Sequence, residues 1–248
     1  MAAGKFGPSS GLLLVDGYSI IANKITALAE KAISLLTDTT GLGDSYYETA
    51  PIGRVTSEVV QEGAFFDTTA LYSHAAFSGS VPTSPQATAR VLCLGFAGQT
   101  VGSPMVGYEG TYSDSYEVVA ELGDLQKVNA TYTISGTRSA GEIIQPLATK
   151  TADWNTESTP VDNTSATSAG GVGFIQCTAA SGFSNFVGRI MESSDDVTYT
   201  GLITFSDNVT APFAERLEMS GSVARYIAFD GNVTGTGSIT VFAGFSRG

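Results

Sequence analysis

The chain has 248 residues and carries 12 Lys and Arg against 24 Asp and Glu, a formal net charge of −12. This acidity argues against a protein that holds nucleic acid by its phosphates, because that contact needs clustered Lys and Arg. A hydrophobic content of 42% excludes an intrinsically disordered chain, and 29 Gly exclude a helical bundle. The composition therefore predicts a mainly β protein with many turns, long enough for one large domain or two.

The N-terminal residues predict neither a secretory signal nor a membrane anchor. Residues 1–11 are rich in Gly, Ser and Ala and are expected to form a flexible arm. The apolar stretch 12–15 is too short for the core of a signal peptide or for a membrane span. We therefore expect synthesis in the cytosol and no membrane partner.

The first half of the chain contains short apolar or alternating runs between turn residues, which predict strands at 58–66, 90–96, 116–122 and 127–135. The last run is the clearest, because Val128, Ala130, Tyr132 and Ile134 alternate with polar residues. One face of this strand should be buried and the other wet. Residues 67–77, after an Asp-Thr-Thr start typical of an N-cap, predict one short helix. The apolar spacing in 19–36 fits a helix, so helix and strand both remain open there.

Residues 149–170 are rich in Ser, Thr, Asp and Gly and predict a linker. Beyond it, strand-like runs occupy 172–178, 186–192, 197–205, 223–229 and 238–245. Turn residues separate them, notably at 193–196 and 230–232. Strands at this spacing with no long helix between them predict a β-sandwich or jelly roll.

Catalytic and ligand-binding patterns are weak throughout the sequence. The single histidine, His74, would have to carry alone any zinc site or Ser-His-Asp triad. Cys93 and Cys177 each lie in an apolar run, which predicts buried thiols and not a disulfide. Asp195 and Asp196 fit a turn better than a calcium or glycosidase site. We therefore expect no enzyme activity and no cofactor.

A series of short motifs runs through most of the chain in a familiar order: Val15-Asp16-Gly17-Tyr18, Gly43-Asp44-Ser45, Pro51-Ile52-Gly53, Gly63-Ala64-Phe65-Phe66-Asp67, Gly170-Gly171-Val172-Gly173 and the ending Phe242-Ala243-Gly244-Phe245. This series resembles the tail tube, or major tail, proteins of long-tailed bacteriophages of the siphophage type. The resemblance implies a tail-tube β-sandwich or barrel at 12–148 and a C-terminal, jelly-roll-like β-sandwich at 171–248. It also places strands at 19–36, which decides our prediction there, although this stretch is richer in Ala than the family's strand.

The function that the resemblance implies is structural. Family members form rings, usually hexamers, that stack into a tube around the tape measure protein, and DNA later passes down the bore without specific binding. Tail terminator and baseplate proteins would be the other partners, and the chain would be made in the host cytoplasm and end in the virion tail. The loop 39–53 would reach an adjacent ring, so the candidate contact residues are Gly41, Gly43, Asp44, Tyr46, Tyr47 and Pro51. A hairpin with only intramolecular contacts is the alternative.

Other functions remain open at the level of sequence. A carbohydrate-binding or adhesive sandwich could use aromatic rings such as Trp154, Tyr199 or Tyr226. A capsid decoration protein is a further alternative, and a glycosidase comes last. The acidity also has two explanations: carboxylates along a bore would repel DNA, or they keep unassembled subunits soluble.

Overall fold

The computed structural model describes residues 11–20, 25–38, 49–66, 89–155 and 159–248. These residues contain fourteen strands in one branched, antiparallel sheet and no helix, so the fold is mainly β, as predicted. The predicted short helix at 67–77 lies outside the described residues. Strand β3 confirms the predicted strand over the second half of 19–36.

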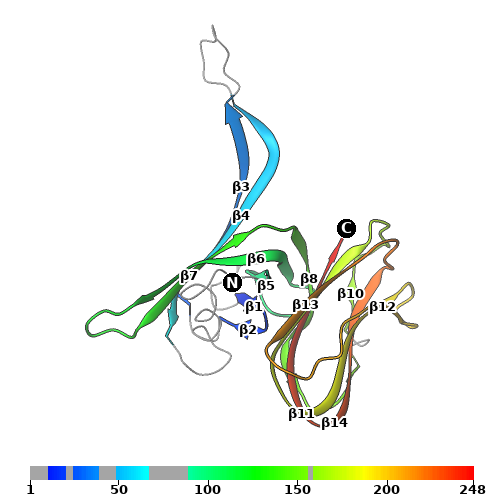
Figure 1. Cartoon of the computed structure of the whole chain (residues 1–248). Helices are drawn as coiled ribbons and strands as arrows, with labels where there is room; N and C mark the ends of the chain where they lie inside the picture. The colour runs from blue at the N-terminus through cyan, green and yellow to red at the C-terminus, as the bar shows by residue number, and fades with distance from the viewer. Residues whose placement is uncertain (1–10, 21–24, 39–48, 67–88, 156–158) are drawn as a thin grey trace, which may run out of the picture.

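The N-terminal strands are β1 (Leu12–Val15), β2 (Tyr18–Ser19), β3 (Ala27–Asp38), β4 (Thr49–Phe65), β5 (Arg90–Gly95), β6 (Pro104–Val119) and β7 (Lys127–Ile134). The C-terminal strands are β8 (Arg138–Lys150), β9 (Trp154–Asn155), β10 (Val161–Asp162), β11 (Gly171–Ser193), β12 (Thr200–Thr204), β13 (Phe213–Met219) and β14 (Tyr226–Arg247). Figure 1 shows two bodies of strands joined side by side, with the β3–β4 hairpin rising away from both.

The first body contains the N-terminal strands, and its sheet branches at β6. The first half of β6 pairs with β5 and β8, and its second half, residues 111–119, pairs with β7. Strand β7 pairs in turn with β4, and β4 pairs with β3. We call β3, β4, β7 and residues 111–119 of β6 the four-stranded sheet.

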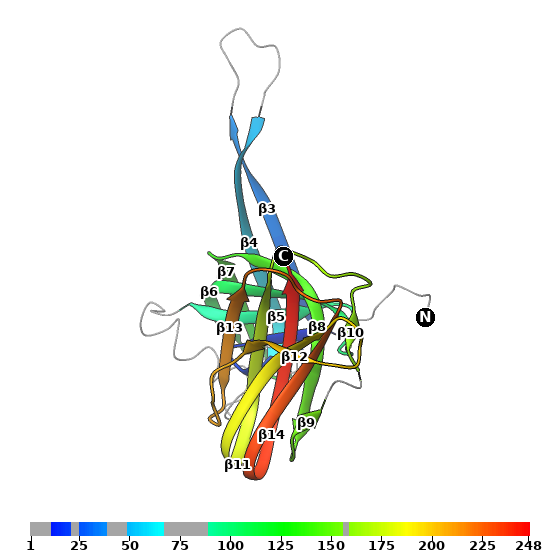
Figure 2. The ribbon, with the colours of Figure 1, turned by 90° about the vertical axis from the view of Figure 1, so that its right-hand side faces the viewer.

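The second body is a β-sandwich made by two long strands, β11 and β14, that pair along almost their whole lengths (Figure 2). The first part of β11 also pairs with β13, and its last part pairs with β12. Because both long strands bend, their two halves face each other across one core. That core includes Ile175, Phe186, Ile190, Phe229 and Val241, all fully buried.

The long strands differ from the prediction of separate strands at 172–178, 186–192, 223–229 and 238–245. The predicted turn at 230–232 is wrong, because these residues lie inside β14. Register shifts near residues 177–185 let β11 bend without losing its ladder to β14. Gly182 makes one of them possible, with φ +81° and no room for a Cβ against the Thr236 carbonyl oxygen.

The segment 149–170, predicted as a linker, lies along the sandwich in its described part. Strand β8 continues to Lys150 beside β14, and the short strands β9 and β10 both pair with β14. A third apolar cluster, which includes Leu14, Cys93, Phe174 and Phe242, joins the two bodies. The chain is therefore continuous in both hydrogen bonding and packing from one body to the other.

Candidate functional site

The β3–β4 hairpin is the most prominent feature of the molecule (Figure 1). Its two strands pair from Ala27 opposite Glu62 to Asp38 opposite Thr49. Only the part of β4 from residue 57 onward also pairs with β7, so the outer part is a two-stranded ribbon. A ribbon of this kind gains stability from a further surface, because an isolated hairpin is marginal in water.

Of the predicted contact residues, only Pro51 lies in the described part of this ribbon. Gly41, Gly43, Asp44, Tyr46 and Tyr47 lie outside the described residues. Pro51 lies in β4, with its backbone opposite Leu36 of β3. Residues 49–51, the described end of the predicted loop that pairs with β3, are therefore strand.

One long side of the four-stranded sheet is free of described strands. Strand β3 pairs with β4 on one side and with no described strand on the other. At the far side of the sheet, β6 pairs with β7 and, as far as Thr111, with β5. The outer side of β3 is therefore a candidate surface for pairing with a further strand.

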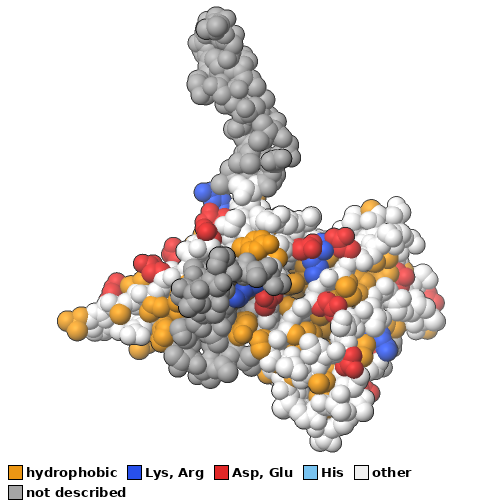
Figure 3. Space-filling model, viewed as in Figure 1, with side chains coloured by type: hydrophobic (Ala, Val, Ile, Leu, Met, Phe, Trp, Pro, Cys, Tyr) orange, Lys and Arg blue, Asp and Glu red, His pale blue; other side chains and the backbone are white. Residues whose placement is uncertain are grey.

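The two faces of this sheet differ in polarity. The core face carries Val59, Val128, Ala130 and Tyr132, all buried, as the alternation in the sequence predicts. The opposite face carries Glu58, Glu62, Thr131, Thr133 and Glu117, and Asn129 Nδ2 donates a hydrogen bond to Glu117 over 3.2 Å. Acidic side chains are visible along the projecting sheet in Figure 3.

A polar latch fixes the base of the hairpin to the first body. The Tyr108 hydroxyl donates to Glu30, and Arg138 Nε donates to the same carboxylate over 2.6 Å. Burial raises the pKa of Glu30, but these hydrogen bonds and the Arg138 charge outweigh it, so its pKa lies below the usual value. The latch joins β3, β6 and β8 and holds the direction in which the hairpin leaves the body.

A second set of contacts fixes the two bodies to each other. The fully buried Gln176 of β11 accepts a hydrogen bond from Gly17 N over 2.7 Å and donates to the carbonyl oxygens of Leu14 and Val91. Asp16 and Gly17, part of the conspicuous Val-Asp-Gly-Tyr motif, both have positive φ in the two-residue turn between β1 and β2. Gly17 lies so close to the Cys177 carbonyl oxygen that a Cβ would be 2.5 Å from it.

Arg216 adds an ion pair between the bodies. Its side chain is 7% exposed and pairs with Glu109 of β6 over 2.7 Å, and it also pairs with Glu218. The guanidinium carbon lies 5.9 Å from the centre of the Phe174 ring. Together with Gln176, this pair makes the sandwich a fixed support for the four-stranded sheet.

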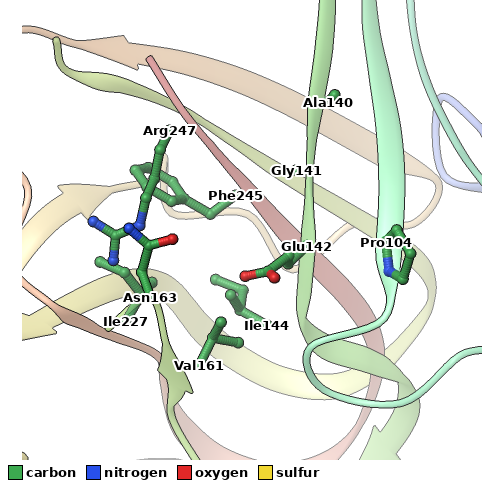
Figure 4. A pocket seen from close by; sticks show the side chains of 10 residues that line it. All are labelled: Pro104, Ala140, Gly141, Glu142, Ile144, Val161, Asn163, Ile227, Phe245 and Arg247. Atoms are coloured by element: carbon green, nitrogen blue, oxygen red, sulfur yellow. The ribbon is translucent and has the colours of Figure 1, made fainter. Parts of the chain in front are cut away.

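One pocket of about 330 Å³ lies on the sandwich side, between β8, β10 and β14 (Figure 4). Its polar side chains are Glu142, Asn163 and Arg247, set against apolar residues that include Phe245. Burial raises the pKa of Glu142, opposed by Arg247, and burial lowers the pKa of Arg247. Arg247 donates hydrogen bonds to the carbonyl oxygens of Val223 and Arg225, so it has a structural role here.

The aromatic residues considered for a sugar site do not line this pocket. Tyr199 donates its hydroxyl hydrogen bond to Asp196 over 2.6 Å. Tyr226 lies under the Arg225 guanidinium, whose carbon is 4.7 Å from the ring centre. Trp154 lies in β9, with its backbone opposite Gly231. The structure therefore does not bring these three residues together around the cavity.

Among the described residues, the remaining reactive groups considered are two buried cysteines and a turn aspartate. Cys93 and Cys177 are buried and unpaired, as predicted, and burial raises the pKa of each thiol to about 12. No group of three or more His, Cys, Asp or Glu in the described ranges could hold a metal ion. Asp195 accepts hydrogen bonds from the backbone of Val197 and Thr198, as a turn residue does. His74 lies outside the described residues.

No helix in the described part of the chain is long and apolar enough to cross a membrane.

Comparisons with known proteins add little to this geometry. No family model and no curated protein matches the chain. Among solved structures, the Dit protein (gp 19.1) of SPP1, described as a paradigm of the hub adsorption apparatus in phages that infect Gram-positive bacteria, is 12% identical. The similarity covers 96% of this chain and 99% of that chain, with a TM-score of 0.35. A TM-score this low does not establish a shared fold.

Sequence reasoning did not predict the uncovered outer side of β3 or the contacts of Gln176 and Arg216 between the two bodies. The β3 edge is missed because pairing partners do not follow from the pattern of a single strand. Gln176 could have been singled out, because it is a lone amide between Ile175 and Cys177 in an apolar run. A polar residue in such a run is buried only with hydrogen-bond partners, so it points to a specific contact.

Proposed function

We propose that this chain is a structural subunit of a phage tail tube, which joins copies of itself into stacked rings and has no catalytic role. The observation that carries the proposal is the long outer side of β3, which no described strand covers. When this side of one copy binds a different side of the next, the contact is heterologous, and such contacts close into a ring when repeated by rotation. The motif series described above supports the same assignment.

The directions of the strands fit this contact. Strands β3, β4, β7 and β6 alternate in direction, since each neighbouring pair is antiparallel. Four strands is an even number, so β3 and residues 111–119 of β6 run in opposite directions. When β6 of one copy lies beside β3 of the next, the new pair is antiparallel too and continues the pattern of the sheet. Ring closure would then cover the outer side of β3 in every copy.

The polar face of the sheet would line the bore in this arrangement, because the core face packs on the body of its own subunit. Glu58, Glu62 and Glu117 on this face outnumber Lys31 and Lys127. A bore of this sign repels phosphate and lets DNA slide without binding. Solubility of the free subunit remains a second use of the same charges.

The β3–β4 hairpin would make the contact between rings. Its two strands extend beyond the body (Figure 1), and in the sequence the candidate residues Gly41 to Pro51 lie between these strands and at the start of β4. The tape measure protein inside the tube, and terminator and baseplate proteins at its ends, are the further partners that this role requires. The assembled virion tail is the corresponding location.

Disulfide cross-linking between copies tests the edge contact. Ala29 of β3 and Ser115 of β6 lie on the polar face of one sheet row, separated by Val60 and Thr131. Three strand spacings are about 14 Å, which is too far for a disulfide within one chain. The double variant Ala29→Cys, Ser115→Cys, with Ala29→Cys, Glu117→Cys as the register alternative, should therefore form a ladder of cross-linked oligomers.

The matched control places the second cysteine on the sandwich, at the exposed Val197. This pair should give no ladder, because the sandwich does not take part in the edge contact. The native Cys93 and Cys177 are buried and should not interfere. The edge contact would be overturned if neither of the two edge cysteine variants formed a ladder under oxidising conditions at concentrations where the protein assembles.

A further inference from the structure

The turn between β6 and β7 carries two leucines that no described residue covers. Leu122 is 109% exposed and Leu125 is 62% exposed, and every residue from 120 to 126 is exposed. Turn residues of a hairpin are normally polar, because they lie in water. Figure 3 shows this hydrophobic tip at the end of the projection formed by β6 and β7. We call residues 120–126 the leucine tip.

The leucine tip has a defined shape. Asp124 N donates a hydrogen bond to the Glu121 carbonyl oxygen over 3.2 Å, and Asp124 pairs with Lys127 over 2.5 Å. Gly123 between the leucines has φ +88°, which closes the turn and directs its neighbours outward. Two leucines held in this way form an apolar knob, which is costly to leave in water.

An apolar pocket lies at the other end of β6. It has a volume of about 320 Å³ and is lined mainly by Leu94, Phe96, Ala97, Pro104, Met105 and Val106. The Phe96 ring is 43% exposed beside it. A cavity of about 150 Å³ holds one benzene molecule, so this pocket has room for the eight carbon atoms of two leucine side chains.

The rim of the pocket complements the charge of the leucine tip. Arg138 lies at the rim and is 42% exposed. Its hydrogen bonds to Glu30 come from Nε and Nη2, which leaves further N–H donors of the guanidinium for a second carboxylate. Glu121 of the leucine tip, next to Leu122, supplies a carboxylate of the right sign.

The leucine tip cannot reach the pocket of its own chain. Val106 of the pocket and the end of β6 at Val119 are joined by extended strand, and at about 3.3 Å per residue they lie roughly 40 Å apart along the strand. The β3–β4 hairpin leaves the sheet at the same end as the pocket, since residues 32–57–134–111 form the last row that all four strands share. The leucine tip and the apolar pocket therefore lie at opposite ends of one subunit.

We propose that the leucine tip of one copy enters the apolar pocket between β5, β6 and β8 of the next copy along the strand direction, as a contact between stacked subunits. The contact is head to tail, so its repetition produces a filament and not a closed dimer. It rests on the proposed function for the identity of the partner, a second copy of this chain. It adds a second axial contact, made at the end of the sheet opposite to the β3–β4 hairpin.

The double variant Leu122→Asp, Leu125→Asp tests this contact, with Val197→Asp as the matched control because Val197 is 80% exposed on the sandwich. Both variants should unfold at the wild-type temperature, because these side chains add nothing to the core. The double variant should need a protein concentration higher by about a hundredfold to form tubes, since each of the two buried leucines supplies about tenfold in binding. Tube formation at the wild-type concentration by the double variant would overturn the proposal.

Cross-linking provides the second test and separates the two proposals. Leu122→Cys combined with Phe96→Cys should form disulfide-linked chains, whereas Leu122→Cys combined with Val197→Cys should not. Rings that still stack normally in the double aspartate variant would remove the leucine contact and leave the tube subunit in place. A Leu122–Phe96 ladder in a protein that never forms tubes would support the leucine contact and contradict the tube-subunit proposal.

Discussion

The edge strands of the two bodies differ in length and composition. The sandwich ends in β12 and β13, strands of five and seven residues, and β13 carries Glu215, Arg216 and Glu218. Short, charged edge strands are the usual protection against unwanted pairing. The four-stranded sheet ends in β3, with twelve residues that include Ala27, Leu28 and Ala29. An edge of this length and composition would aggregate unless a specific partner covered it.

This difference separates the roles of the two bodies. The sandwich buries large aromatic residues such as Phe186 and Phe229 in its own core, and its edge strands are short. In the four-stranded sheet, the long outer side of β3 has no described neighbour. The comparison teaches that β3 is the edge on which the proposed contact between copies depends.

The largest effect is expected in the sandwich core. Phe229→Ala should lower the free energy of unfolding by about 3–5 kcal/mol, because Phe229 is fully buried. Ala29→Ser on the exposed side of β3 should leave the free energy of unfolding within about 0.5 kcal/mol of wild type. Urea unfolding of both variants measures the contrast. Equal losses in the two variants would contradict the distinction between the bodies.

The junction of the bodies should respond almost as strongly. Gly17→Ala should lower the melting temperature more than Gly102→Ala, although both glycines have φ +80°. The Gly102 variant bears only the conformational cost of about 1 kcal/mol, because nothing lies near its Cβ. The Gly17 variant adds a clash with the backbone of Cys177 and Phe213. Identical melting temperatures would show that the turn does not pack on the sandwich as described.

The Glu30 latch should give a smaller, pH-dependent effect. Glu30→Gln should cost about 1 kcal/mol at neutral pH through loss of the charge-assisted hydrogen bonds from Arg138 and Tyr108. Because the pKa of Glu30 is lower in the folded chain, this stability is present above the unfolded pKa and disappears as pH falls through the folded value. Thermal unfolding of both proteins between neutral pH and about pH 3 should therefore converge at the acidic end. A constant difference across this range would exclude the ionised latch, and Glu62→Gln serves as the exposed control.

The smallest effect concerns the polar face. Glu58→Gln, Glu62→Gln and Glu117→Gln together should leave assembly unchanged and increase the retention of DNA by assembled tubes at low salt. Co-sedimentation of tubes with short duplex DNA measures this retention. Retention equal to that of wild-type tubes would remove the proposed role of acidity in the bore and favour solubility as its purpose.

The sequence predicted those features of the fold that depend on the residue pattern of a single strand. The alternation from Val128 to Ile134 gave β7 and its buried face, and the apolar surroundings of Cys93 and Cys177 gave two buried thiols. Strands β8 and β13 were missed. Strand β8 contains Gly141 and Pro146, and β13 alternates in no simple way, so neither has the pattern of a half-buried strand.

The candidate interface was predictable only in part. The Gly and Pro residues around 39–53 predict a loop, of which residues 39–48 lie outside the described part of the chain and residues 49–51 pair with β3. The outer side of β3, the leucine tip and its pocket depend on which strands are neighbours, and that is decided by long-range pairing. Leu122 and Leu125 lie on either side of Gly123 in the sequence. From a single sequence, exposed leucines such as these cannot be distinguished from core residues.

The central claim is that the outer side of β3, at the margin of the four-stranded sheet, pairs with an identical copy of this chain. Negative-stain electron microscopy of the purified full-length protein over a range of concentrations tests it most directly. The account predicts rings with a central hole that stack into tubes as the concentration rises. A uniform population of single subunits at the highest concentration would contradict it.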